Sequence, residues 1–289
     1  MRRVAERTAS RAGRAAFQFV KHFELTVHKL LSVRWISSYI SDSIARFVPA
    51  TFLKGNLRTV MRKNAARPKT LLESLDALIE ERHLLKHPFY QAWTEGKLSR
   101  ESLQLYAQQY YQHVRAFPEN LQQLADRADG PLAELIQENL DEELDPSGPH
   151  PMLWRHFAES LGVSEATMAD ACPLPGVSAL LDTFDEVSSQ GTMAQAVAAF
   201  YAYEAQVPEI STQKISGLRR FYDVTEPRAL AYFGVHEEAD VRHRAAWRSW
   251  LAKQESGDYF DVLCAAERSL KALWGALDAV YPQGCAAKN

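Results

Sequence analysis

The chain has 289 residues, of which 46% are hydrophobic and 24% charged, so it is long enough for one large helical domain or two small ones. Its three cysteines, Cys172, Cys264 and Cys285, show no paired spacing, which argues against a disulfide framework or a zinc knuckle and favours a reducing compartment. No apolar run approaches the length of a membrane span, so we expect a soluble, cytoplasmic protein without a transmembrane segment.

The charge is unevenly distributed along the chain. Residues 1–69 hold 15 Lys and Arg against three acidic residues, a net of +12, whereas the remainder has a net charge of −15. This basic N-terminal extension resembles an organelle transit peptide, but it also fits a membrane-surface helix or an over-long translated start before Met61. Its basic residues are dispersed and show no recognition motif, so we expect no nucleic-acid partner. We therefore expect a separate extension at 1–69 and one domain at 70–285.

From residue 71 onward the apolar residues follow a helical period, and almost nothing has the pattern of a strand. Stop signals such as Thr94-Glu95-Gly96 and the Pro and Gly turn at 145–149 separate the helices. The predicted helices span residues 71–93, 99–129, 132–144, 150–161, 177–188, 192–222, 226–254 and 258–281. About eight helices joined mostly by short loops predict an all-α bundle.

The predicted helix 226–254 carries titratable residues on the face that should be buried. At roughly 100° per residue, His236, Asp240 and His243 fall within about 60° of one another. The same face is otherwise apolar and aromatic, so three titratable groups interrupt a stripe made for the core. Buried without partners they would be costly. Two imidazoles and a carboxylate suit iron, manganese or zinc, which predicts a metal site.

Three further residues on other helices could complete such a site. Glu204 shares its face with core residues, and Pro208 should bend the helix beside it. Glu143 and His150 flank the turn at 145–149, so their side chains should lie near each other. Inward-facing Glu, Asp and His in a helical bundle are typical of di-iron and di-manganese carboxylate proteins.

Other interpretations of these residues remain open. Taken alone, Glu143 or His150 could be an ordinary surface residue, and Glu204 a hydrogen-bonded core carboxylate. Three other histidines could be alternative ligands, but each lacks a carboxylate at helical spacing in an apolar stripe. We expect these three to be structural or to support the ligands; they are His87, His113 and His156.

At these residues the chain resembles the heme-oxygenase-like dimetal oxidases, and within them the family of the chlamydial protein associating with death domains. The resemblance covers about residues 71–284 and leaves the basic extension unmatched. It rests on KHPFY at 86–90, YYQHVRAFP at 110–118, YAYEAQVP at 201–208 and HEEADVRH at 236–243. The counterparts of that family's six metal ligands are Glu143, His150, Glu204, His236, Asp240 and His243.

The resemblance implies a fold of seven to eight helices, similar to heme oxygenase and thiaminase II, with two metal ions, Fe/Fe or Fe/Mn, in place of heme. It also implies O2-dependent formation of p-aminobenzoate for folate biosynthesis, in which a tyrosine of the protein supplies the carbon skeleton and a lysine the amino group. By the matching motifs, the tyrosine would be Tyr90, the lysine Lys214, and a further pocket tyrosine Tyr203.

Two rival functions are consistent with the sequence. The helical body could be an interaction protein that binds death-domain-type partners, or a metal-free enzyme similar to pyrroloquinoline-quinone synthase or thiaminase II. The carboxylate-rich set argues against a metal-free pocket. We expect the protein to form a homodimer.

Overall fold

The computed structural model describes residues 70–254 and 259–281. The predicted N-terminal extension at 1–69 lies outside the described residues, as do residues 282–285 at the end of the predicted domain. The described part is helical and contains no strand, so the all-α prediction is confirmed.

The helices are, in chain order, α4 (Leu71–Glu81), the 3-10 helix η1 (Leu84–Lys86), α5 (Pro88–Thr94), α6 (Arg100–Ala125), α7 (Gly130–Glu143), α8 (His150–Ser160), α9 (Glu165–Ala169), α10 (Pro175–Ser189), α11 (Met193–Glu204), α12 (Val207–Phe221), α13 (Pro227–Leu251) and α14 (Phe260–Val280). None of these described helices combines the length and the hydropathy of a membrane span.

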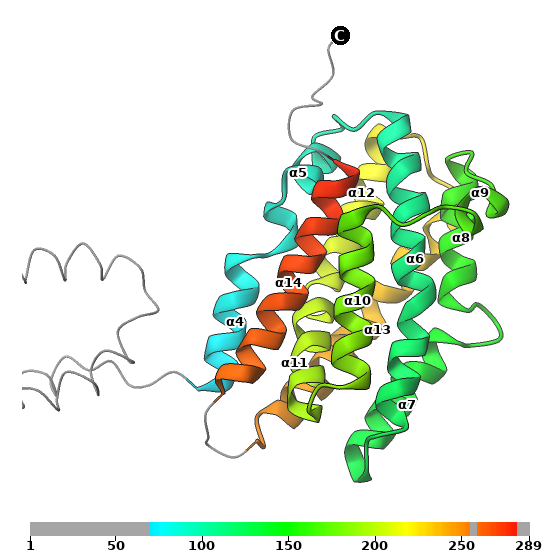
Figure 1. The fold of residues 1–289 in the computed structure, drawn as a ribbon. Coiled ribbons are helices and arrows are strands. Elements are labelled where there is room, and N and C mark those ends of the chain that lie inside the picture. The colour runs from blue at the N-terminus through cyan, green and yellow to red at the C-terminus, as the bar shows by residue number, and fades with distance from the viewer. Residues whose placement is uncertain (1–69, 255–258, 282–289) are drawn as a thin grey trace, which may run out of the picture. The chain divides into compact units, whose positions relative to one another are not determined.

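The long helices pack side by side as a bundle (Figure 1). Helix α14 packs against α10 and α11, α13 packs against α8 and α12, and α6 packs against α7, α8 and α10. Helix α11 lies between α13 and α14 and is buried on all sides, since every residue from Ala196 to Glu204 is inaccessible or nearly so. A helix that is apolar all round belongs in the core, and Glu204 is carried into the interior at its end.

The predicted helix 71–93 is broken in the structure, which is a correction. Helix α4 ends at Glu81 and α5 begins at Pro88, with η1 between them. Proline disfavours a helical conformation in the residue before it, and His87 is indeed extended. The Nδ1 atom of the His87 ring accepts a hydrogen bond from the Phe89 amide, 3.0 Å away, so this histidine caps α5. Its Nε2 lies 3.1 Å from the Asp278 carboxylate, which gives His87 a structural role.

The predicted helix 192–222 is also broken, at the residue where a bend was expected. Helix α11 ends at Glu204 and α12 begins at Val207, because Pro208 has no amide hydrogen to continue the ladder. Glu204 is therefore the last residue of a helix and not a mid-helix residue. The fully buried Gln206 fixes both breaks: it accepts from the Leu84 amide at 2.8 Å and donates to the Ala202 carbonyl at 2.7 Å.

Candidate metal centre

Four helices bring six titratable side chains together inside the bundle. Helix α13 carries three of them one to two turns apart, and α11 contributes its last residue. The other two are the last residue of α7 and the first residue of α8, which the loop 144–149 turns back on one another. The six are between 2% and 7% exposed and form two groups whose ligand atoms lie within 4.8 Å of one another: Glu143, His150 and His236; and Glu204, Asp240 and His243.

In the first group, two imidazoles flank one carboxylate. Glu143 Oε1 lies 3.0 Å from His150 Nδ1 and 4.0 Å from His236 Nε2, and the centres of the two imidazole rings are 4.5 Å apart. His236 Nδ1 lies 2.6 Å from the Tyr232 carbonyl oxygen, to which it can only donate. Its Nε2 lone pair is therefore free and faces Glu143, the arrangement that a metal-binding histidine needs.

In the second group, two carboxylates flank one imidazole. His243 Nδ1 lies 3.4 Å from Asp240 Oδ1 and 3.9 Å from Glu204 Oε2. Glu204 also accepts hydrogen bonds from Asn139 Nδ2 at 3.1 Å and from Trp247 Nε1 at 2.6 Å. Both donors are neutral, so they orient the Glu204 carboxylate without cancelling its charge.

Burial shifts the pKa values in this centre toward the neutral forms. It raises the pKa of Glu204 to about 8, and it raises that of Asp240 well above its usual range, with a further contribution from Glu143. It lowers the pKa of His236 well below the usual range. Burial would also lower the pKa of His150, but the adjacent Glu143 carboxylate outweighs it and raises that pKa.

A pair of divalent cations would satisfy groups that the protein alone leaves unsatisfied. Among the described residues, the three carboxylates pair with histidines and with no Lys or Arg. Two buried atoms of the second group, Asp240 Oδ2 and His243 Nε2, have no hydrogen-bond partner there. Buried charges are normally paired or bound to a metal, and mixed imidazole and carboxylate sets suit iron and manganese. The residues present therefore fit a dimetal centre.

The two groups open onto one small cavity between the helices. Its lining includes Glu143, Glu204, His236 and Asp240, together with aromatic side chains and His113. His113 is fully buried, neither ring nitrogen has a hydrogen-bond partner in the described structure, and burial lowers its pKa to about 3. The ring is neutral at physiological pH and close to the centre, whereas the half-exposed His156 lies outside this lining.

A second buried group surrounds Lys214, which is 5% exposed and has no carboxylate within ion-pairing distance in the described structure. Its Nζ donates a hydrogen bond to Tyr106 Oη at 2.7 Å. Five aromatic rings lie 5.1–5.7 Å from that nitrogen: Tyr90, Tyr106, Tyr110, Trp154 and Phe233. Burial lowers the pKa of Lys214 to about 7, so much of the amine is uncharged at neutral pH.

Tyr90 and Tyr203 occupy different places around this pocket. Tyr90 Oη lies 3.4 Å from Tyr106 Oη, and its ring centroid is 5.5 Å from Lys214 Nζ. Tyr203 accepts a hydrogen bond from Tyr110 at 3.0 Å and lines the cavity beside the metal-binding groups. The structure thus places Tyr90 next to Lys214, and Tyr203 next to the six residues of the candidate metal centre.

Aromatic rings connect the lysine pocket to the centre. The Tyr232 ring lies 4.3 Å from the His236 ring and 4.8 Å from the Trp154 ring, which in turn is 5.7 Å from Lys214 Nζ. In the described part of the chain, no hydrogen bond or ion pair joins Tyr90 or Lys214 directly to the six residues. The two sites are neighbours, connected through the rings of Trp154 and Tyr232.

Sequence reasoning did not single out several residues that shape the site. Trp247 and Asn139 hold Glu204, and Tyr106 holds Lys214. A usable signal exists in two cases: Asn139 precedes Glu143 by one helical turn, and Tyr106, Tyr110 and His113 recur at helical spacing on α6.

The chain is similar to several known proteins. Residues 104–274 match the model of a family described as iron-containing redox enzymes. A 4-aminobenzoate synthase of Nitrosomonas europaea is 36% identical over 75% of this chain and 93% of its own length. A 4-aminobenzoate synthase of Chlamydia pneumoniae is 39% identical over 71% of this chain and 92% of its own length. A solved structure from Nostoc punctiforme, described as a CADD-like protein of unknown function, has a TM-score of 0.57 at 20% identity and covers 71% of this chain and 96% of that one.

Proposed function

Because the chain belongs to the family of iron-containing redox enzymes, which includes these 4-aminobenzoate synthases, we propose that it forms p-aminobenzoate in an oxygen-dependent reaction. The product implies a role in folate biosynthesis. The fold is that of the heme-oxygenase-like proteins, and the domain is proposed to span residues 70–285, with the basic segment 1–69 as a separate extension.

Glu143, His150 and His236 would hold one metal ion, and the other three residues of the centre, Glu204, Asp240 and His243, would hold the second. The proposed pair is Fe/Fe or Fe/Mn, which when bound would supply the capacity to activate O2. The protein holds the ligands apart from bulk water and fixes their orientation through the Tyr232 carbonyl and the Trp247 indole.

Tyr90 and Lys214 are proposed to be consumed in the reaction. Tyrosine carries a carbon substituent para to oxygen, and p-aminobenzoate carries a carboxyl carbon para to nitrogen, so the ring and Cβ of Tyr90 can become those of the product. The Lys214 amine is the nitrogen source, and its Nζ lies 5.5 Å from the Tyr90 ring. The Cε–Nζ bond of Lys214 and the Cα–Cβ bond of Tyr90 would break, the phenol oxygen would leave as water, and O2 would be the oxidant that converts Cβ to the carboxyl carbon. Because burial lowers its pKa to about 7, this amine can act as a nucleophile at neutral pH. Tyr203 lines the cavity beside the candidate metal ligands.

The observation that carries this proposal is the pairing of two features in one protein. A carboxylate-rich centre that pairs with no Lys or Arg among the described residues is connected, through the rings of Tyr232 and Trp154, to a buried lysine that has no ion-pair partner there and lies against a tyrosine. A metal-free enzyme has no use for three buried carboxylates, and an interaction protein has no use for either feature. Association into a homodimer and binding of death-domain-type partners remain predictions.

The full-length protein, loaded with Fe2+ or with Fe2+ and Mn2+ under anaerobic conditions, would test this proposal on exposure to O2. We expect at most one p-aminobenzoate per chain and a loss of mass that peptide mapping localises to Tyr90 and Lys214. The variant Tyr90→Phe should bind the same metals and release no product. Many turnovers at unchanged protein mass would instead demonstrate an external substrate, and product from Tyr90→Phe would exclude Tyr90 as the source.

A further inference from the structure

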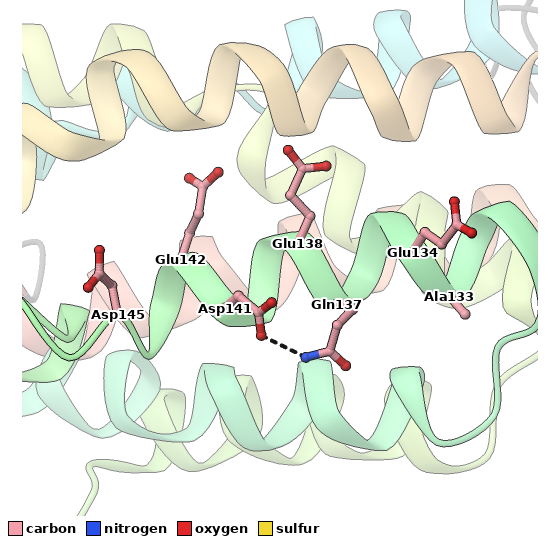
Figure 2. A pocket seen from close by; sticks show the side chains of 7 residues that line it. All are labelled: Ala133, Glu134, Gln137, Glu138, Asp141, Glu142 and Asp145. Carbon is pink, nitrogen blue, oxygen red and sulfur yellow. Dashed lines mark hydrogen bonds between the residues drawn. The ribbon is translucent and has the colours of Figure 1, made fainter.

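The outer face of α7 carries a groove lined by acidic side chains (Figure 2). Five carboxylates contribute to it: Glu134, Glu138, Asp141, Glu142 and Asp145. Of these, only Glu142 forms an ion pair with a Lys or Arg in the described part of the chain, through Arg242 at 2.6 Å. The groove therefore concentrates negative potential at the surface of the bundle.

The groove continues toward the candidate metal centre. Figure 2 shows Glu134, Glu138 and Glu142 projecting from the same side of α7. Glu138 lines both this groove and a smaller pocket whose other walls include Asn139, His243 and Trp247. The second pocket thus touches a proposed ligand and the two side chains that hold Glu204.

His243 stands at the inner end of this path. The ring is more than nine-tenths buried, and its Nδ1 faces Asp240. Its Nε2 has no hydrogen-bond partner in the described structure and lies 3.5 Å from Glu142 Oε2, on the groove side. A buried imidazole nitrogen that lacks a hydrogen-bond partner and faces the groove is an observation separate from the number of acidic side chains.

Arg242 lies at the outer end of this path, between the groove and solvent. Its guanidinium pairs with Glu142, lines the smaller pocket and remains more than half exposed. Ion pairs that remain accessible to water contribute little to stability. A divalent cation that competes for Glu142 can therefore displace Arg242 at little cost.

We propose that this groove is a docking site for hydrated divalent cations and the route by which they reach the dimetal centre, with Glu138 and Glu142 passing the ion toward His243. The inference rests on the proposed function, since it assumes that the centre takes up metal. It assigns α7 a role in loading the enzyme that is separate from the role of Glu143 in holding a metal.

The rate of metal uptake by the full-length, metal-free protein tests this proposal. Mn2+ would be added in a stopped-flow experiment at low ionic strength, with an indicator dye reporting free Mn2+ and elemental analysis reporting the final content. The test variant is Glu138→Gln/Asp141→Asn, in which both changed residues are exposed. The matched control is Glu81→Gln/Asp261→Asn, which removes the same charge from exposed positions on α4 and α14.

We expect the groove variant to load about tenfold more slowly than the control, with the same number of ions bound at equilibrium, because removing the local field lowers the association rate but leaves the ligands intact. Raising the salt concentration should slow the wild type and the control more than the groove variant. Equal rates for groove variant and control would overturn the inference, even where both proteins bind two ions. Absence of bound ions at equilibrium in the wild type would instead reject the dimetal centre.

A second variant tests whether Glu142 guides metal ions toward the centre or only orients the His243 ring. Arg242→Ala removes the closing cation and makes the groove more negative, so loading should become several-fold faster at unchanged content. If Glu142 served only to orient His243, loss of its partner would not accelerate loading, and an unchanged or slower rate would count against the route.

Discussion

Lys214 is an amine kept out of water without a counter-ion, with Tyr106 as its hydrogen-bond acceptor. Since burial lowers its pKa to about 7, the fraction of neutral amine increases as the pH rises through this value. Product formed in a single exposure to O2 should increase over the same range. Lys214→Arg, which stays protonated, should form none at any pH; a pH-independent yield in the wild type would contradict a nucleophilic lysine.

The buried Lys214 should also make the free energy of unfolding depend on pH. Between about pH 7 and its unfolded pKa of about 10.4, the unfolded state binds a proton that the folded state does not. The contribution of Lys214 to the free energy of unfolding therefore rises with pH in this window, by up to about 1.4 kcal/mol per pH unit, and is at its lowest below pH 7. Urea unfolding at pH 7 and pH 9 should show a smaller difference for Lys214→Met than for the wild type.

Trp247 supports the centre through a single hydrogen bond to Glu204, 2.6 Å long. Trp247→Phe should keep most of the packing but lose this donor, and losses of about 10- to 100-fold in metal affinity are typical for such supporting groups. Trp250→Phe is the matched control, because Trp250 lies on the same helix and its side chain makes no hydrogen bond to the centre. Equal Mn2+ dissociation constants for the two variants would remove Trp247 from this role.

At the level of single residues, the sequence indicated the candidate metal ligands but not the residues around them. His236, Asp240 and His243 stood out because charged groups on a buried stripe require compensation. Trp247 and Tyr106 did not, because a buried aromatic residue is normal in a core and only three-dimensional contact reveals its hydrogen bond. The assignment of the six as ligands stays a prediction.

Helix α12 brings Lys214 to Tyr90 by packing closely on α5. A Cβ atom at Gly217 would lie 2.6 Å from the Trp93 ring, so Gly217→Ala must push the two helices apart. We expect a loss of about 1–3 kcal/mol in unfolding free energy and a lower yield of product, because Tyr90 moves with α5. At Gly234 on α13 a Cβ would meet nothing within 4 Å, and Gly234→Ala should gain about 0.5–1 kcal/mol from helix propensity. Equal unfolding free energies for the two variants would disprove the close contact.

The helices themselves were predicted well where caps and turns are strong. Ser99 caps the start of α6 and the Pro and Gly turn separates α7 from α8, as the sequence indicated. Two predicted helices were too long, because apolar periodicity continues through Pro88 and Pro208 and hides the breaks. The fully buried Gln206 connects the two breaks through a hydrogen bond from the Leu84 amide, 122 positions away in the sequence. Such a distant contact cannot be seen in the sequence.

The whole molecule should be destabilised by its own centre when no metal is bound. The folded pKa of Glu204 is about 8, above its unfolded value of about 4.3, so the folded state holds a proton that the unfolded state releases between these values. The unfolding free energy of the metal-free chain should therefore fall as the pH rises through this window. Bound metal displaces that proton, so the rise in Tm that Mn2+ produces should be larger at pH 8 than at pH 6. An equal rise at both values would contradict a buried carboxylate ligand.

The all-helical fold followed from periodicity alone, since the 3.6-residue pattern continues from residue 71 to the last described helix. The family and its activity came from a resemblance in four short segments, and the comparisons confirm the family. Periodicity alone could not bring Glu143 and Glu204 to α13, because that depends on how the helices cross. Localisation and assembly stay predictions.

The number of metal ions held by the six residues can be measured directly. Anaerobic titration of the full-length protein with Mn2+, followed by removal of free metal and elemental analysis, should give two ions per chain. His150→Ala and His243→Ala should each retain one, because they damage different groups of ligands. Two ions in the wild type that persist in both variants, or a wild type that binds none, would contradict the dimetal centre.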